Sequence, residues 1–169
     1  MPILQSLFRR SGQPKRVDAP APFEKVLADW RALRTLRGRG EAEEALREFE
    51  SKNGVRLPAD FRDYFASVDK TLLSRESMTR GAGLYSFWSL NEVRSVPEEW
   101  PGTADCEHLR GYFIFADWSI SCWAYAICLA PSEFGKIRII HTEADHPFAA
   151  GSFTEFIDAY IRDPVTPVG

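Results

Sequence analysis

The sequence predicts an α+β domain, in which N-terminal helices and one C-terminal helix pack on a mostly antiparallel sheet. Apolar residues recur at helical spacing near both ends of the chain, whereas aromatic and β-branched residues concentrate between them. The densest of these stretches covers residues 112–129. Polar residues divide it at 117–121, so we expect a central hairpin of two antiparallel strands joined by a tight connection.

A basic, proline-rich segment begins the chain. Residues 1–40 hold nine Lys or Arg against three Asp or Glu, which leaves the rest of the chain with 12 against 21 and an acidic balance. The three prolines of residues 11–22 predict an extended tether, and the segment before them forms either a short docked helix or a disordered basic arm. We therefore expect an arm and tether at 1–22, a domain at 23–163 and a tail at 164–169.

Three helices are expected before the sheet. The first starts at Phe23, where apolar residues recur at helical spacing, and ends at Gly38. The second covers residues 41–53: glutamates in its first turn suit the helix dipole, and Gly54 supplies the left-handed residue that closes it. Pro58 then opens a third helix with an aromatic stripe.

The segments between this third helix and the central hairpin are shorter. Residues 69–83 lack any period and predict a loop. A strand at 84–88 is expected to pass directly into a brief helix near Val93, because residues 89–92 have the spacing of a capping box. Residues 97–110 predict an acidic loop.

Two elements are expected after the hairpin. Residues 136–141 are rich in β-branched side chains and predict a third long strand. A second capping box at residues 152–155 opens a terminal helix, which Pro164 ends.

The bulk composition is that of a globular protein with a cytoplasmic address. The chain has 169 residues, 44% hydrophobic and 27% charged, which is enough to bury one core. No apolar run approaches the roughly 18 residues that cross a bilayer, and the N-terminal charges follow the apolar residues, the reverse of a secretory signal. The odd number of cysteines, with Cys122 and Cys128 in apolar sequence, predicts buried reduced thiols.

Four stretches of the chain occur in the order of a known family. They are residues 46–66, with the turn Gly-Val-Arg-Leu-Pro between two helices, then 87–93, 113–126 and 150–157. Together they resemble the SMI1/KNR4 family, also called the SUKH superfamily, over residues 23–163. The chain departs from the family pattern after Val68, where Asp69-Lys70-Thr71 replaces the usual Asn-Gly-Gly.

The resemblance implies an α+β fold and, in bacteria, a cytoplasmic immunity protein that binds a cognate polymorphic toxin and neutralises it. Such a toxin is frequently a nuclease. Fungal relatives act instead as regulatory or scaffolding adaptors, and this alternative stays open. Neither role implies an enzyme or a cofactor. The acidic balance of the domain favours a basic protein partner and argues against nucleic acid as its ligand.

An aromatic residue ringed by carboxylates marks the candidate contact surface. Trp100 lies in the acidic loop beside Pro101, where it either anchors a protein interface or folds back on the domain. The surrounding carboxylates would speed encounter with a basic partner. The candidate partner-binding residues are Trp100, Glu98, Glu99, Asp105 and Glu107, together with Asp69 in the preceding loop.

Catalytic and metal chemistry are less well supported by the residues. Asp117, Cys122 and His141 contain the groups of an orienter, a nucleophile and a base, but a thiol buried among apolar neighbours is unreactive. Asp117 is instead expected at a turn or strand end, where it satisfies backbone amides.

A metal site is not expected either. His141, Asp145 and His146 form a loose cluster, and His108 is far along the chain, whereas structural zinc sites use four ligands at paired spacings.

Overall fold

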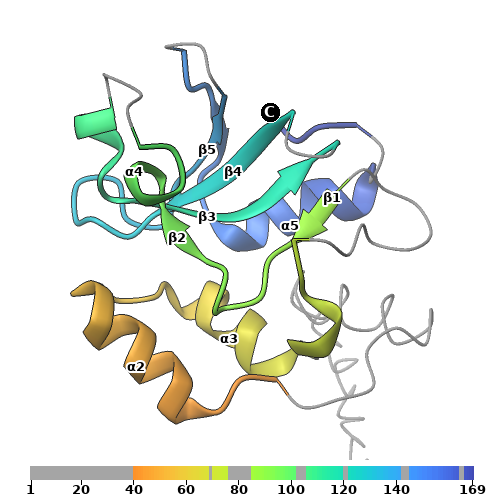
Figure 1. The fold of residues 1–169 in the computed structure, drawn as a ribbon. Helices are drawn as coiled ribbons and strands as arrows, with labels where there is room; N and C mark the ends of the chain where they lie inside the picture. The colour runs from red at the N-terminus through yellow and green to blue at the C-terminus, as the bar shows by residue number, and fades with distance from the viewer. Residues whose placement is uncertain are drawn as a thin grey trace, which may run out of the picture.

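Six strands form one sheet, and every pairing in it is antiparallel (Figure 1). The strands follow the order β1-β3-β4-β5-β6, and β2 also pairs with β3. Together with the helices described below, this sheet confirms the predicted α+β class. The strands are β1 (Tyr85–Phe87), β2 (Arg94–Ser95), β3 (Tyr112–Trp118), β4 (Trp123–Cys128), β5 (Ile137–Ile140) and β6 (Phe148–Ala150).

The computed structural model describes seven segments of the chain. The basic arm, the tether and the expected helix that starts at Phe23 lie outside them, as do the side chains of Leu72, Cys106 and Glu107. Within the described segments, no helix is long and apolar enough to cross a membrane. The described segments are 40–68, 70–75, 85–101, 106–119, 122–141, 145–163 and 166–169.

The end of α2 and the start of α5 have the caps that the sequence predicts. Glu43 and Glu44 stand in the first turn of α2, and Gly54 closes that helix with φ 63° in the left-handed region, as predicted. The Ser152 side chain caps the last helix by accepting a hydrogen bond from the Glu155 amide at 3.1 Å. The helices are α2 (Glu43–Asn53), α3 (Ala59–Ser67), η1 (Lys70–Leu72), α4 (Val96–Glu99), η2 (Cys106–Leu109) and α5 (Phe153–Arg162).

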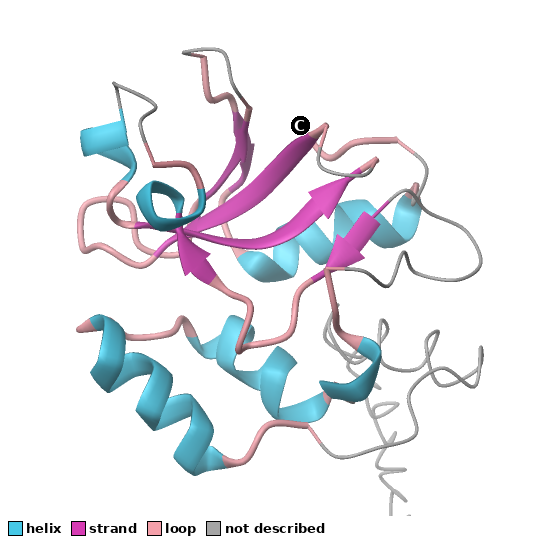
Figure 2. Cartoon of the chain, viewed as in Figure 1, coloured by secondary structure: helices cyan, strands magenta, loops and turns pink. Residues whose placement is uncertain are grey.

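One face of the sheet carries the main core, which it shares with α2, α3 and α5 (Figure 2). Phe61 of α3 lies with its ring centroid 5.5 Å from that of Phe115 in β3 and 4.9 Å from that of Phe153 in α5. Phe49 of α2 contacts Phe113 of β3 at a centroid distance of 6.0 Å. Aromatic side chains of this size dominate the energetics of a core, so this layer holds the helices on the sheet.

The opposite face carries a smaller cluster, because side chains alternate across a strand. The alternation breaks in β3, where the register with β4 shifts between Ile114 and Ala116. Phe115 and Ala116 therefore both join the main core. Asp117 then lies on the side of Trp88 and the smaller cluster. The residues of this cluster are Trp88, Val96, Leu109, Tyr112, Ile114, Ala124, Ala126, Cys128 and Ile140.

The expected helix near Val93 is absent from this described region, although the Glu92 half of its capping box forms. Glu92 accepts hydrogen bonds from the amide of Ser89 at 2.9 Å and from its hydroxyl at 2.7 Å. These bonds close a single turn, after which Arg94 pairs with Ile114 in the sheet. Long-range strand pairing therefore overrides the local signal for a helix.

The expected acidic loop at 97–110 is in fact largely helical where it is described. It contains most of α4 and the whole of η2, and the Ser95 side chain and backbone pair with Glu98 as the capping box of α4.

The strand β6 was not predicted, and the expected strand at 136–141 is shortened to the four residues of β5.

The prediction of two buried thiols is wrong for one of them. Cys128 is buried in β4, but Cys122 is exposed, because it lies in the connection between β3 and β4 rather than in a strand.

The C-terminal residues pack back on the domain: Val168 is buried, and its amide donates to the Tyr85 hydroxyl at 2.8 Å.

Candidate partner-binding surface

The predicted contact residues Glu98 and Glu99 both lie on α4. Ser95 caps this short helix: its amide donates to the Glu98 carboxylate at 3.0 Å and its hydroxyl donates to the same oxygen at 2.8 Å. Pro97 stands in the first turn, where its missing N–H is not needed. Capping leaves Glu98 exposed at the surface, with its carboxylate held close to the backbone.

Glu99 has a different role from Glu98. Its side chain is 15% exposed and forms an ion pair with Arg75. The Arg75 guanidinium also lies over the ring of Trp88, 4.2 Å from the ring centroid, and the Arg75 amide donates to Glu92 at 3.3 Å. Glu99 therefore ties the described segment 70–75 to α4, and this contact occupies the carboxylate in the free protein.

Trp100 is partly buried and packs against the smaller cluster of the sheet. Its amide donates to the carbonyl of Val96 at 2.9 Å, which closes the last turn of α4. The packing agrees with the alternative in which this tryptophan folds back on the domain. Asp69, Asp105 and the side chain of Glu107 lie outside the described residues.

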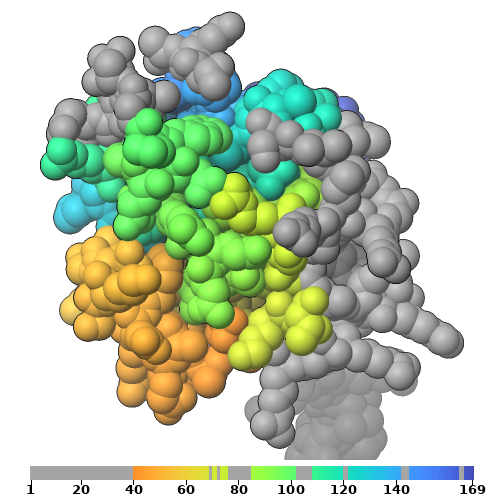
Figure 3. Space-filling view, viewed as in Figure 1, coloured from red at the N-terminus to blue at the C-terminus, as the bar shows by residue number. Residues whose placement is uncertain are grey.

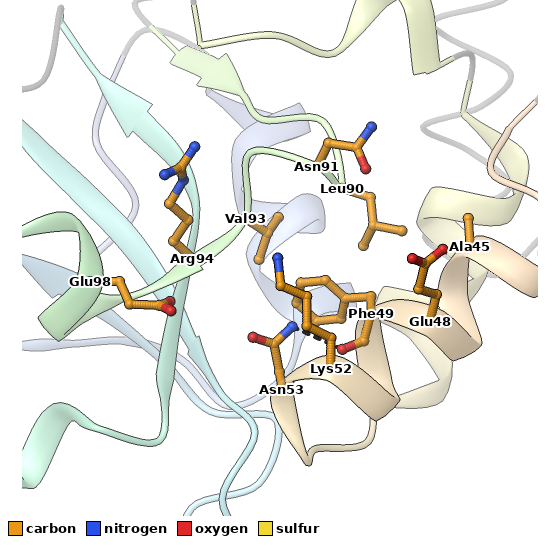
Figure 4. A pocket seen from close by; sticks show the side chains of 10 residues that line it. All are labelled: Ala45, Glu48, Phe49, Lys52, Asn53, Leu90, Asn91, Val93, Arg94 and Glu98. Carbon is orange, nitrogen blue, oxygen red and sulfur yellow. Dashed lines mark hydrogen bonds between the residues drawn. The ribbon is translucent and has the colours of Figure 1, made fainter.

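A groove of about 430 Å³ opens between α2 and the segment that runs from Leu90 into α4. In the space-filling view, the green surface of this segment borders the orange surface of α2 (Figure 3). Glu98 projects from α4 and Lys52 from α2 toward the space between them (Figure 4). The lining residues are Ala45, Glu48, Phe49, Lys52, Asn53, Leu90, Asn91, Val93, Arg94 and Glu98.

The groove combines an apolar floor with a charged rim. Phe49, Leu90 and Val93 are buried side chains of the main core that reach its lining. Lys52 and Arg94 are exposed on the rim. An apolar centre with a polar, solvent-accessible rim is the usual anatomy of a protein interface.

The rim charges differ from those on another side of α2 in having no ion-pair partner within the described residues. There, Glu43 and Glu50 pair with Arg62 of α3 at 2.6 and 2.9 Å. The hydrogen bond from Arg62 lowers the pKa of Glu43. The groove charges Glu48 and Lys52, which α2 presents one turn apart, remain available to a partner.

Sequence reasoning found only one of the ten lining residues. The acidic segment around Glu98 predicts a contact there, but Glu48, Lys52 and Arg94 come from segments that give no signal of binding. Their convergence depends on how α2 packs beside β2, which no local pattern reveals. The presence of Lys52 and Arg94 also makes the surface mixed in sign rather than uniformly acidic.

The three residues considered for catalysis come from the same end of three neighbouring strands, because Asp117 pairs with Ala124 of β4 and Ala124 pairs with Ile140, the residue before His141. Asp117 is buried in β3 and accepts a hydrogen bond from the Trp88 indole at 2.8 Å. Cys122 lies in the β3–β4 connection, and His141 follows the end of β5, which β4 separates from β3.

His108, although far along the chain from the other histidines, lies close to His146 in space. Its ring centroid lies 5.9 Å from that of His146, and the His141 ring is 5.8 Å from His146.

Comparison with known proteins places this arrangement in a family. No curated protein matches the chain. The model of the SMI1 / KNR4 family (SUKH-1) matches residues 40–159, from three residues before α2 well into α5, which is most of the chain. The sheet, its helices and this match agree with the four sequence stretches noted above, and the chain belongs to the SMI1/KNR4 family (SUKH-1).

Proposed function

We propose that this protein is an immunity protein, which binds a cognate polymorphic toxin directly and blocks its active surface. Membership of the SMI1/KNR4 family over residues 40–159 is the observation that carries the proposal. In this role the protein acts by occlusion, without catalysis of its own, in the cytoplasm of the cell that makes the toxin.

The charge of the domain supports a basic toxin, and a nuclease in particular. Residues 41–169 hold 21 acidic side chains against 12 basic ones. A nuclease needs Lys and Arg to contact phosphates, so its active surface is attracted to an acidic protein and association is faster.

The groove beside α2 is the contact surface we propose. Its charges Glu48, Lys52 and Arg94 lack ion-pair partners among the described residues, and Glu98 adds a carboxylate at the other end. Charges of both signs at fixed positions favour one partner over others, because a mismatched partner leaves like charges opposed. We also propose contacts at Trp100, Asp69, Asp105 and Glu107, which the sequence alone suggests.

Co-expression with the toxin gene beside this one tests the proposal. Cells that express the toxin should grow only when this protein is present, and the two purified proteins should form a stable complex. A folded protein that neither rescues growth nor associates with the toxin would refute the immunity role and favour an adaptor.

A further inference from the structure

Two cations line the groove, although the domain as a whole is acidic. Lys52 comes from the last turn of α2, and Arg94 comes from β2 on the opposite wall. Both side chains are exposed, and neither forms an ion pair with any residue that the structure describes. Residues 41–169 hold 21 acidic side chains against 12 basic ones, so this positive charge is the opposite of what the net charge of the domain predicts.

Lys52 has no ion-pair partner among the described residues even though a carboxylate stands one helical turn before it. Glu48 and Lys52 are four residues apart in α2, in the order that usually favours an ion pair. In the same helix, Glu43 and Arg47 have the same spacing and order and do pair, at 3.0 Å. The Lys52 side chain instead extends from α2 into the groove, where its ammonium is placed to meet a group from another molecule (Figure 4).

The carboxylate on the other wall of the groove is already engaged. The Ser95 amide donates to the Glu98 carboxylate at 3.0 Å, and the Ser95 hydroxyl donates to the same oxygen at 2.8 Å. These bonds hold Glu98 against the start of α4. Of the four charged side chains that line this described groove, Lys52, Arg94 and Glu48 therefore carry the available charge, and its balance is positive.

The floor of the groove would strengthen an ion pair formed there. Phe49, Leu90 and Val93 are only 8%, 3% and 6% exposed, and these apolar side chains lie beneath the charged rim. When a partner covers the groove, water leaves the space above this floor. The attraction between opposite charges then increases, because the effective dielectric constant around them falls.

We propose that Lys52 and Arg94 bind acidic side chains, Asp or Glu, that lie within the basic surface of the toxin. This inference rests on the proposed immunity function and names the partner chemistry of its groove. The acidic domain attracts the toxin from a distance, whereas the two cations recognise carboxylates at contact. A basic protein without these carboxylates would place like charges opposite Lys52 and Arg94, so the two cations favour the cognate toxin.

Reversing the charge of Lys52 separates recognition at contact from general attraction, because the two predict opposite results. Lys52→Glu makes the domain more acidic, so general attraction alone predicts equal or tighter binding to a basic toxin. Loss of a bound carboxylate predicts instead that binding weakens by about 10-fold or more, through faster dissociation. Arg94→Glu should act in the same direction. Calorimetry and stopped-flow mixing with a catalytically inactive variant of the toxin from the neighbouring gene measure affinity and dissociation.

Arg56→Glu is the matched control. Arg56 is exposed in the turn after α2 and lies outside the groove, so its reversal makes the same change in net charge and should leave dissociation unaltered. Lys52→Arg keeps the charge and should retain binding. If Lys52→Glu binds the toxin as tightly as Arg56→Glu does, the inference is wrong although the immunity function stands. A parent protein that does not bind the toxin refutes the immunity function, and this inference with it.

Discussion

The indole nitrogen of Trp88 donates a 2.8 Å hydrogen bond to the Asp117 carboxylate, and both residues are buried. The bond links the residue after β1 to the end of β3, just beyond the register shift at Phe115. Asp117 therefore contributes to the fold through a side-chain partner far along the chain.

Replacing Asp117 should destabilise the protein through Trp88. Asp117→Leu removes the acceptor and leaves a buried indole N–H unsatisfied, which costs about 1–3 kcal/mol of unfolding free energy. Asp117→Asn keeps an oxygen that accepts the bond and should lose less. Urea unfolding of the two variants and the parent measures the difference, and equal stability of Asp117→Leu and Asp117→Asn would contradict this role.

The elements that were predicted correctly are those whose signals are local. Gly54 closes α2 and Ser152 opens α5 because a cap is set by residues within one turn. The central hairpin was predictable for the same reason, since its two strands are adjacent in sequence. Spacing alone was misleading at residues 89–92, because the pairing of Arg94 with Ile114 stops the helix that the capping box favours.

The groove and the histidine cluster could not be predicted, because each is made by segments that tertiary packing brings together. In the sequence, Lys52 is an ordinary charged residue of an amphipathic helix and Arg94 is one of an edge strand. They line the same groove only because α2 packs beside β2 in the folded protein. His108 is separated from His146 by the whole central hairpin in sequence. Only Glu98 has a local signal, which is the charge of its sequence neighbours.

Glu98 and Glu99 should give different effects when each is replaced by lysine. Glu98→Lys changes an exposed groove charge and should slow association with a basic toxin and reduce its salt dependence. It also removes the bonds with Ser95 that cap α4, so a modest loss of stability accompanies the change. Glu99→Lys places a cation against Arg75 and should instead lower the unfolding free energy by about 1 kcal/mol or more.

Asp63→Lys is the matched control, since Asp63 is exposed on α3 and lies outside the groove. Stopped-flow association at several salt concentrations and urea unfolding separate the two effects. If Glu98→Lys associates as Asp63→Lys does, the interface does not include this end of the groove.

Gly40 should not tolerate a side chain. A Cβ atom at this position would lie 2.1 Å from the carbonyl oxygen of Ala66, which is backbone and unable to turn away. The close approach accompanies the 2.7 Å hydrogen bond from the Glu41 amide to the Phe65 carbonyl. Gly40→Ala should therefore cost about 1–3 kcal/mol by overpacking.

The double variant Gly40→Ala, Ala66→Gly tests whether the backbone is responsible for this cost. Removing the Ala66 methyl group leaves the carbonyl in place, so stability should not recover in thermal unfolding. Full recovery in the double variant would show that side-chain packing, rather than this backbone contact, determines the effect.

Glu133 should make stability depend on pH in acid. Hydrogen bonds from Tyr112, at 2.6 Å, and from Lys136, together with the charge of Arg138, lower the pKa of Glu133 to about 2. The folded pKa lies below the usual value of 4.5, so the unfolded chain takes up this proton first. The stabilising contribution is complete above about pH 4.5 and is lost as the pH falls through about 2.

Glu133→Gln should therefore lose less stability than the parent between pH 4.5 and 2, whereas the control Glu48→Gln, at an exposed groove position, should follow the parent. Tyr112→Phe removes the largest cause of the lowered pKa and should return it toward the usual range. Carboxyl NMR titration of Glu133 reads this pKa directly. A normal value in the parent would mean that the Tyr112–Glu133 bond does not persist in solution.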